Sequence, residues 1–171
     1  MLACESDHYG HAVKRLETLC QNLQSDQIHK VGYTQLLKST LRLFFSFFHD
    51  GIASGAASAL LDNEPLRKLL STEINFDKLD EHINNGRLRA LCITALAYNS
   101  GHNISFFQGD PSIKGWRRNQ RLGVGTRLTH DHLMASSALP TIFSPVKIDH
   151  EYFGDGAIRQ RAPLSAALHL G

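Results

Sequence analysis

The sequence has 171 residues, of which 42% are hydrophobic and 20% are charged, a composition typical of a folded globular protein. A chain of this length buries roughly two thirds of the surface that it exposes when unfolded, so it can form one domain, or part of one, around a hydrophobic core. The formal net charge of +2 excludes a surface built as a whole to bind nucleic acid or anionic lipid. An electrostatic partner would have to bind a local patch.

The cysteines and the apolar stretches indicate the compartment. The three cysteines lie at wide spacings, with no Cys-x-x-Cys pair and no disulfide framework, which favours a reducing cytoplasm. Residues 1–8 lack the basic region and the long apolar segment of a secretory signal. The most apolar stretch, residues 41–61, is interrupted by Arg42, His49 and Asp50, and no run approaches the roughly 20 apolar residues of a membrane span. We therefore expect a cytoplasmic protein.

The first third of the chain is predicted to be helical. Apolar residues at three- and four-residue steps predict an amphipathic helix over residues 8–24. A second helix is predicted over residues 34–48, whose aromatic cluster is typical of core packing, with a lipid-contacting face as the alternative. The small residues 52–59 predict a loop. Asn63-Glu64-Pro65 then predicts the start of a helix with proline in its first turn.

The middle of the chain changes to strands. Residues 76–84 predict a short helix that ends at Asn85-Gly86. Residues 87–98 predict a largely buried strand, which turns into a second strand at residues 103–108 and so forms a hairpin. The polar and basic residues 109–125 are expected to be a connection.

The last part of the chain alternates helix and strand. A helix is predicted over residues 129–138, since Pro140 stops it. Short strands are predicted at residues 146–148 and 151–153, and Pro163 opens a last helix. No internal repeat is visible.

Two neighbouring patterns carry most of the functional information. Residues 135–145 follow the pattern Ala-Ser-x-Ala-x-Pro-x-x-Phe-x-Pro, and Gly154-Asp155-Gly156-Ala157 follows closely. Together they resemble the C-terminal portion of the patatin-like phospholipase family, in which a helix with this pattern leads into a strand and an Asp-Gly-Gly or Asp-Gly-Ala turn carries the catalytic aspartate. Residues 61–70 and 106–109 resemble the bacterial branch of that family.

The resemblance implies an α/β fold, with a central sheet flanked by helices and the active site at strand ends. It implies hydrolysis of acyl esters in phospholipids or related lipids by a catalytic dyad of serine and aspartate, through an acyl-serine and without histidine, metal or other cofactor. Asp155 matches the aspartate that takes the serine proton. Gly154 and Gly156 would let the backbone turn sharply and the nucleophile approach without a Cβ clash. The alternative for an isolated Asp-Gly pair is a hairpin turn.

The nucleophilic serine of that dyad is missing. The family places it in a Gly-x-Ser-x-Gly elbow, whereas the nearest string here, Gly51-Ile-Ala-Ser-Gly55, has its serine at the fourth position. We therefore expect residues 1–171 to be a partial patatin-like domain, truncated just after the elbow and inactive alone. The alternatives are a non-catalytic lipid-binding or degenerate module, and an incomplete gene model. A partial domain should place Asp155 at a strand end beside Met1, and expose an apolar face or an unpaired sheet edge.

Other candidate sites are weaker. His130 and His132 flank Asp131, but residues two apart on a helix point to different faces, which disfavours a metal site. Ser136 and Ser137 are expected to pack against the sheet, with their hydroxyls bonded to backbone.

The basic residues 114–121 surround the only tryptophan, Trp116. Trp116, Arg117 and Arg118 could contact phospholipid headgroups, because tryptophan favours the membrane interface and arginine binds phosphate. The alternative is a solvated loop with Trp116 packed beneath it. Eight residues are too small a footprint for nucleic acid.

Overall fold

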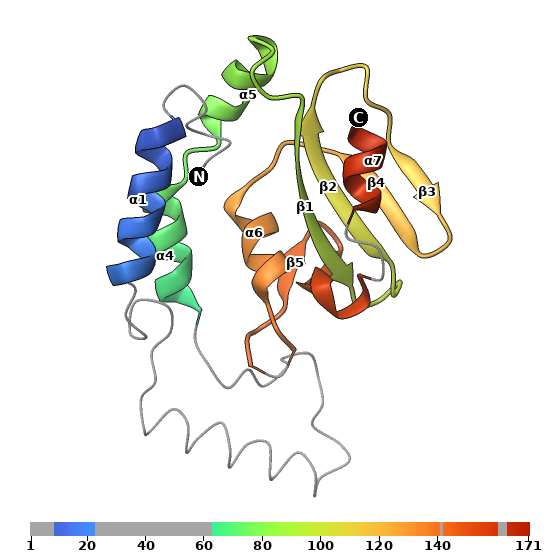
Figure 1. Cartoon of the computed structure of the whole chain (residues 1–171). Helices are drawn as coiled ribbons and strands as arrows, with labels where there is room; N and C mark the ends of the chain where they lie inside the picture. The colour runs from blue at the N-terminus through green and yellow to red at the C-terminus, as the bar shows by residue number, and fades with distance from the viewer. Residues whose placement is uncertain (1–8, 23–62, 141, 161–163) are drawn as a thin grey trace, which may run out of the picture.

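The computed structural model describes residues 9–22, 63–140, 142–160 and 164–171, in which a mixed six-stranded sheet is flanked by helices (Figure 1). In chain order the elements are α1 (Tyr9–Asn22), α4 (Glu64–Glu73), α5 (Asp77–Asn84), β1 (Ala90–Ala97), β2 (Asn103–Gly109), β3 (Trp116–Arg118), β4 (Arg121–Gly125), α6 (His130–Ser137), β5 (Val146–Ile148), β6 (Glu151–Asp155), the 3-10 helix η2 (Gly156–Arg159) and α7 (Ser165–Leu170).

The described helices lie where the sequence predicts them. α1 falls within the predicted range 8–24, and α4 has Pro65 in its first turn. α5 is followed by Gly86, whose φ of +69° lies in the left-handed region that favours glycine. The helix predicted over residues 34–48 and the loop predicted over residues 52–59 lie outside the described residues.

The first helix lies beside α4 (Figure 1), where Arg15 and Glu73 form an ion pair at 2.8 Å. α4 packs on α6, and α6 packs on β1. α1 therefore lies on the helical side of the molecule, beside α4, with α6 nearer to the sheet (Figure 1). Met1 lies outside the described residues, so its distance from Asp155 stays untested.

The strands lie in the order β3-β4-β2-β1-β6-β5. β1 and β2 form the predicted antiparallel hairpin, with Ala90 opposite Gly109 and Leu96 opposite Asn103. β6 is antiparallel to β1 and β5, whereas β4 is parallel to β2, which makes the sheet mixed.

Residues 109–125 contain two strands, where the sequence predicts only a connection. β3 and β4 form a tight hairpin around Asn119, whose φ is +49°. Exposed arginines are typical of an edge strand such as β3, because charged side chains discourage pairing with another chain. The same arginines made this segment resemble a solvated loop, and the pairing of β4 with β2 joins residues distant in sequence.

The two faces of the sheet are covered differently (Figure 1). On one face, Ala95 of β1, Phe106 of β2 and Phe153 of β6 pack with the buried Met134 and Ala135 of α6. This face is the hydrophobic core. The alternate residues of the same strands point to the other face, where α7 packs on β1.

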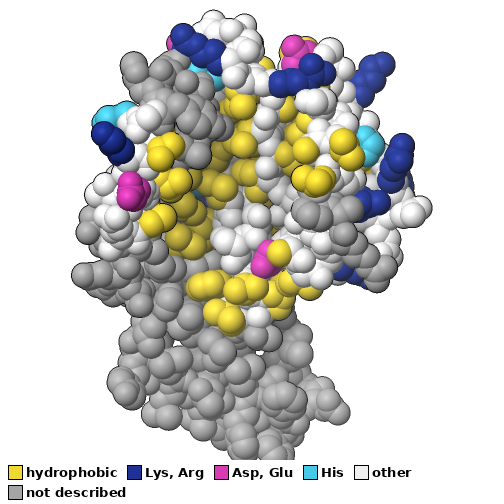
Figure 2. All heavy atoms as spheres, in the orientation of Figure 1, with side chains coloured by type: hydrophobic (Ala, Val, Ile, Leu, Met, Phe, Trp, Pro, Cys, Tyr) yellow, Lys and Arg dark blue, Asp and Glu magenta, His cyan; other side chains and the backbone are white. Residues whose placement is uncertain are grey.

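An open apolar hollow runs between the helical side of the molecule, with α1 and α4, and the sheet (Figure 2). In addition, β6 pairs with β1 only at residues 95–97, so within the described residues the segment 90–94 has a strand partner on one side alone, which is β2. Whether residues 1–171 are a partial domain, as the sequence analysis expects, stays a prediction.

Candidate functional site

Asp155 is the last residue of β6 and sits at the turn into η2, as predicted. Its backbone N–H donates to the carbonyl of Ala138, at the end of α6, at 2.9 Å. Its carboxylate Oδ1 accepts from the N–H of Ala157 at 2.9 Å. These two bonds fix the backbone and one carboxylate oxygen of Asp155 at the sheet end.

The other carboxylate oxygen, Oδ2, accepts no hydrogen bond from any residue that the structure describes. Asp155 is half-buried and pairs with Ala95, so it points to the same face of the sheet as the core. Ala138 and Ala157 are the two hydrogen-bond partners of Asp155, and each is followed in the chain by an exposed apolar residue, Leu139 and Ile158. The free oxygen can therefore accept a proton from a group that approaches through partly apolar surroundings.

Tyr98 is a site residue that the sequence analysis missed. Its hydroxyl lies over Gly154, where any Cβ would overlap it. Burial of the hydroxyl and, secondarily, the negative charge of Asp155 raise the pKa of Tyr98 above its ordinary value of 10.0. Tyr98 follows the end of β1, and no local pattern predicts that this position meets β6.

Gly154 and Gly156 are needed for close packing and not for a left-handed backbone, since neither has a positive φ. A Cβ at Gly156 would overlap the carbonyl oxygen of Thr94 on β1. The carbonyl of Gly156 also accepts from the side-chain Nδ2 of Asn103 at 3.3 Å. The glycines thus bring the strand of Asp155 against β1, and their predicted role in the approach of a nucleophile stays a prediction.

The histidines of α6 have separate structural partners. His130 Nε2 is 2.9 Å from the carbonyl of Ile74, whereas His132 Nδ1 accepts from the backbone N–H of Thr129 at 3.1 Å and completes a capping box. Burial lowers the pKa of His132 below its ordinary value of 6.5, against the opposing charges of Asp131 and Asp149. No group of three or more potential metal ligands occurs among the described residues.

The serines of α6 are not hydrogen-bonded to Asp155. Ser137 donates its hydroxyl to the carbonyl of Leu133 at 3.0 Å, as expected for a helical serine. Ser136 is half-buried. Within the described residues, no serine hydroxyl is hydrogen-bonded to Asp155.

Trp116 lies in a stack between Phe107 and His169, with ring centroids 5.3 and 4.7 Å apart. Its ring covers Gly123, where a Cβ would overlap it. The indole is therefore packed on the sheet, while the neighbouring Arg117 and Arg118 are exposed. In the part of the chain that the structure describes, no helix is long and apolar enough to cross a membrane.

A surface cavity of about 320 Å³ lies at the far end of β2 from Asn103, between Gln108, Asp110 and Arg127. None of its lining residues is hydrogen-bonded to Asp155. Its position separates it from the end of β6.

Comparison with known proteins identifies a family. The model of the patatin-like phospholipase family matches residues 2–168. No match is found among curated proteins or among solved structures. The mixed sheet flanked by helices is consistent with the α/β fold of that family.

Proposed function

The chain belongs to the patatin-like phospholipase family, and we propose that it supplies Asp155 as the general base of a Ser–Asp dyad that hydrolyses acyl esters of lipids. Family membership supports a lipid acyl hydrolase. The observation that carries the assignment of the base is the half-buried carboxylate of Asp155, which has one oxygen fixed by Ala157 and the other unoccupied by any described donor.

The proposed reaction begins with proton transfer from a serine hydroxyl to Oδ2 of Asp155. The serine oxygen then attacks the ester carbonyl, and the tetrahedral intermediate collapses as the proton passes from Asp155 to the leaving alkoxide. Water then loses a proton to the same carboxylate and attacks the acyl-serine. The bond from the acyl group to the serine oxygen breaks, that oxygen takes the proton back from Asp155, and the fatty acid is released. The N–H of Ala157 donates to Oδ1 and so holds the carboxylate in one orientation at the end of β6.

The surroundings of Asp155 fit an apolar acyl chain. Tyr98, Leu139 and Ile158 are 38%, 41% and 50% exposed, and each lies next to the strand end in sequence or in space. Exposed apolar side chains at a polar catalytic group are typical of a lipid site. The hollow of Figure 2 offers further apolar surface.

The serine itself must come from outside the 171 residues in this proposal, because they contain no Gly-x-Ser-x-Gly motif. We propose that a longer chain provides the elbow, placing its serine at Oδ2 of Asp155.

The same missing motif favours a second function, that of a non-catalytic, lipid-binding patatin-like module.

With either function, we propose that Arg117 and Arg118 on the exposed edge strand β3 contact anionic headgroups at a membrane surface. Free Cys20 and Cys92 fit the proposed cytoplasmic location.

Ester hydrolysis tests the proposal. The 171-residue chain should hydrolyse p-nitrophenyl esters only at background rate, and a longer chain that contains an upstream Gly-x-Ser-x-Gly should turn them over. In the longer chain, Asp155→Asn should remove nearly all turnover, because an amide cannot accept the serine proton but keeps the acceptor for Ala157. Asp149→Asn, on the exposed β5–β6 turn, is the matched control and should keep full activity.

Asp155-dependent hydrolysis by the 171 residues alone would sink the assignment of the serine to an outside segment. Lipid binding by the longer chain, without hydrolysis, would favour the non-catalytic module.

A further inference from the structure

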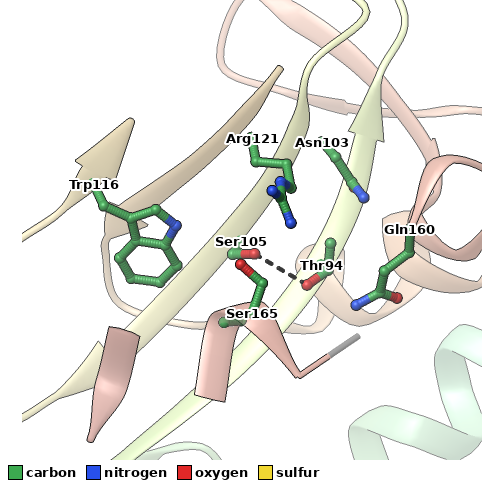
Figure 3. A pocket seen from close by; sticks show the side chains of 8 residues that line it. Thr94, Asn103, Ser105, Trp116, Arg121, Gln160 and Ser165 are labelled. Carbon is green, nitrogen blue, oxygen red and sulfur yellow. Dashed lines mark hydrogen bonds between the residues drawn. The ribbon is translucent and has the colours of Figure 1, made fainter. Parts of the chain in front are cut away.

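A polar pocket lies on the α7 face of the sheet, opposite to the face of Asp155 (Figure 3). Register brings its residues together: Thr94 of β1 is opposite Ser105 of β2, and Asn103 of β2 is opposite Arg121 of β4. Trp116 of β3, Gln160, and Ser165 and Ala166 of α7 complete the lining, and none of the lining residues is acidic.

Arg121 gives the pocket a positive charge. It is half-buried, and among the described residues it forms no ion pair with any acid. Arg118 is directly opposite Arg121 on the antiparallel β3, so two like charges face each other across the hairpin. Both features are unfavourable without a counter-charge, which an anion in the pocket would supply.

Asn103 adds a buried acceptor without a donor. The residue is 5% exposed; its Nδ2 is used by the carbonyl of Gly156, and its Oδ1 has no hydrogen-bond partner. A buried acceptor left unsatisfied is unfavourable, and a hydroxyl-bearing ligand would satisfy it.

Hydroxyl groups complete the set. Thr94 Oγ1 and Ser105 Oγ are hydrogen-bonded to each other at 3.2 Å, and both hydroxyls also lie beside the thiol of Cys92. The hydroxyl of Ser165, at the start of α7, points toward the hydroxyls of Thr94 and Ser105. The side chain of Arg121 extends from β4 toward the same two hydroxyls (Figure 3). The enclosed volume of about 20 Å³ accommodates one oxygen-sized group, with the rest of the ligand at the open mouth.

We propose that this pocket binds a phosphate-type oxyanion, a function independent of the proposed hydrolase site. The anion oxygens accept from Arg121 and the hydroxyls, and a P–OH group donates to Oδ1 of Asn103. Near neutral pH, inorganic phosphate carries both accepting oxygens and a hydroxyl, whereas a phosphate monoester headgroup carries a hydroxyl only as its monoanion.

Calorimetric titration of the full chain with inorganic phosphate, in a chloride buffer, tests the site. We expect saturable binding that weakens on the order of tenfold or more in Arg121→Gln, because a charge-assisted donor is lost. Arg117→Gln is the matched control: it removes the same charge from the neighbouring strand, but its partner is Leu122 and it points to the opposite face. Its phosphate affinity should stay within about twofold.

Ser165→Ala is a second variant that removes one donor with little effect on folding, and it too should weaken binding. Sulfate has the same shape without a hydroxyl and should bind less tightly than phosphate; equal binding would overturn the role of Asn103. Absence of saturable phosphate binding, or an equal loss in Arg117→Gln and Arg121→Gln, would overturn the site.

Vesicles of phosphatidylcholine with and without phosphatidic acid distinguish the source of the phosphate. A headgroup site predicts binding to phosphatidic acid that free phosphate displaces and that Arg121→Gln weakens more than Arg117→Gln. A site for free phosphate predicts the calorimetric result with no such competition. Both outcomes support the oxyanion site.

Discussion

At the scale of single residues, the packing at the end of β6 depends on glycine, which has no side chain. Gly156 leaves no room for a Cβ beside the carbonyl of Thr94, so Gly156→Ala should lower the free energy of unfolding by about 1–3 kcal/mol, measured by denaturant titration. Gly10, in α1, has open space around it, and Gly10→Ala should be neutral or slightly stabilising. Equal stability of Gly156→Ala and wild type would refute the close packing of η2 on β1.

Tyr98 reports the charge of Asp155. Since burial is the larger cause of its raised pKa and Asp155 the smaller, Asp155→Asn should lower the pKa of Tyr98 but leave it above the ordinary 10.0. Ultraviolet titration of tyrosinate measures the shift, with Tyr98→Phe identifying its signal among the four tyrosines. An unchanged Tyr98 titration in Asp155→Asn would show that the two side chains do not interact.

The sequence predicts the position of Asp155 but only part of its environment. The Asp-Gly-Ala pattern and the neighbouring strand are local features, so they place Asp155 at a strand end. Tyr98 and Asn103 belong to the β1–β2 hairpin. They meet Gly154 and Gly156, on either side of Asp155, because β1 pairs with β6, and no local pattern specifies that pairing. Likewise, the packing role of Gly156 follows from Thr94 on β1.

At the scale of elements, α6 has a pH-sensitive start. The folded-state pKa of His132 lies below 6.5, so its contribution to stability is present above pH 6.5 and is lost as pH falls through the folded pKa. Protonation of Nδ1 would also break its bond from Thr129, and loss of such a cap costs roughly 1 kcal/mol.

His132→Gln should retain an acceptor in the capping box without titrating. Its free energy of unfolding should therefore fall less than that of wild type between about pH 7.5 and about pH 5.5, measured by denaturant unfolding at each pH. If the two proteins lose equal stability over this range, His132 is not the responsible histidine.

Elements with strong local patterns were predictable and the others were not. α1, α4, α5 and the β1–β2 hairpin follow from apolar periodicity, Pro65 and glycine. β3 and β4 were missed, because their polar composition resembles a loop and β4 is held by parallel pairing with β2. The position of α1 beside α4 depends on contacts between distant segments, such as Arg15 with Glu73.

At the scale of the whole molecule, positive charge gathers on the β3 edge while the net charge is only +2. If this edge meets membrane, Arg117→Glu with Arg118→Glu should weaken binding to anionic vesicles, and added salt should do the same. Hydrolysis of a soluble ester by the longer chain should not change, since the arginines lie away from Asp155. Equal sedimentation of wild type and the double variant with anionic vesicles would leave β3 as ordinary surface.

The central claim is that Asp155 activates a serine, and the labelling rate of that serine by a fluorophosphonate probe tests it most directly. In the longer chain that carries the elbow, Asp155→Asn should label about 100-fold or more slowly than wild type, because general-base assistance contributes at least that factor. Asp149→Asn should label at the wild-type rate. Labelling of Asp155→Asn as fast as wild type would contradict the account.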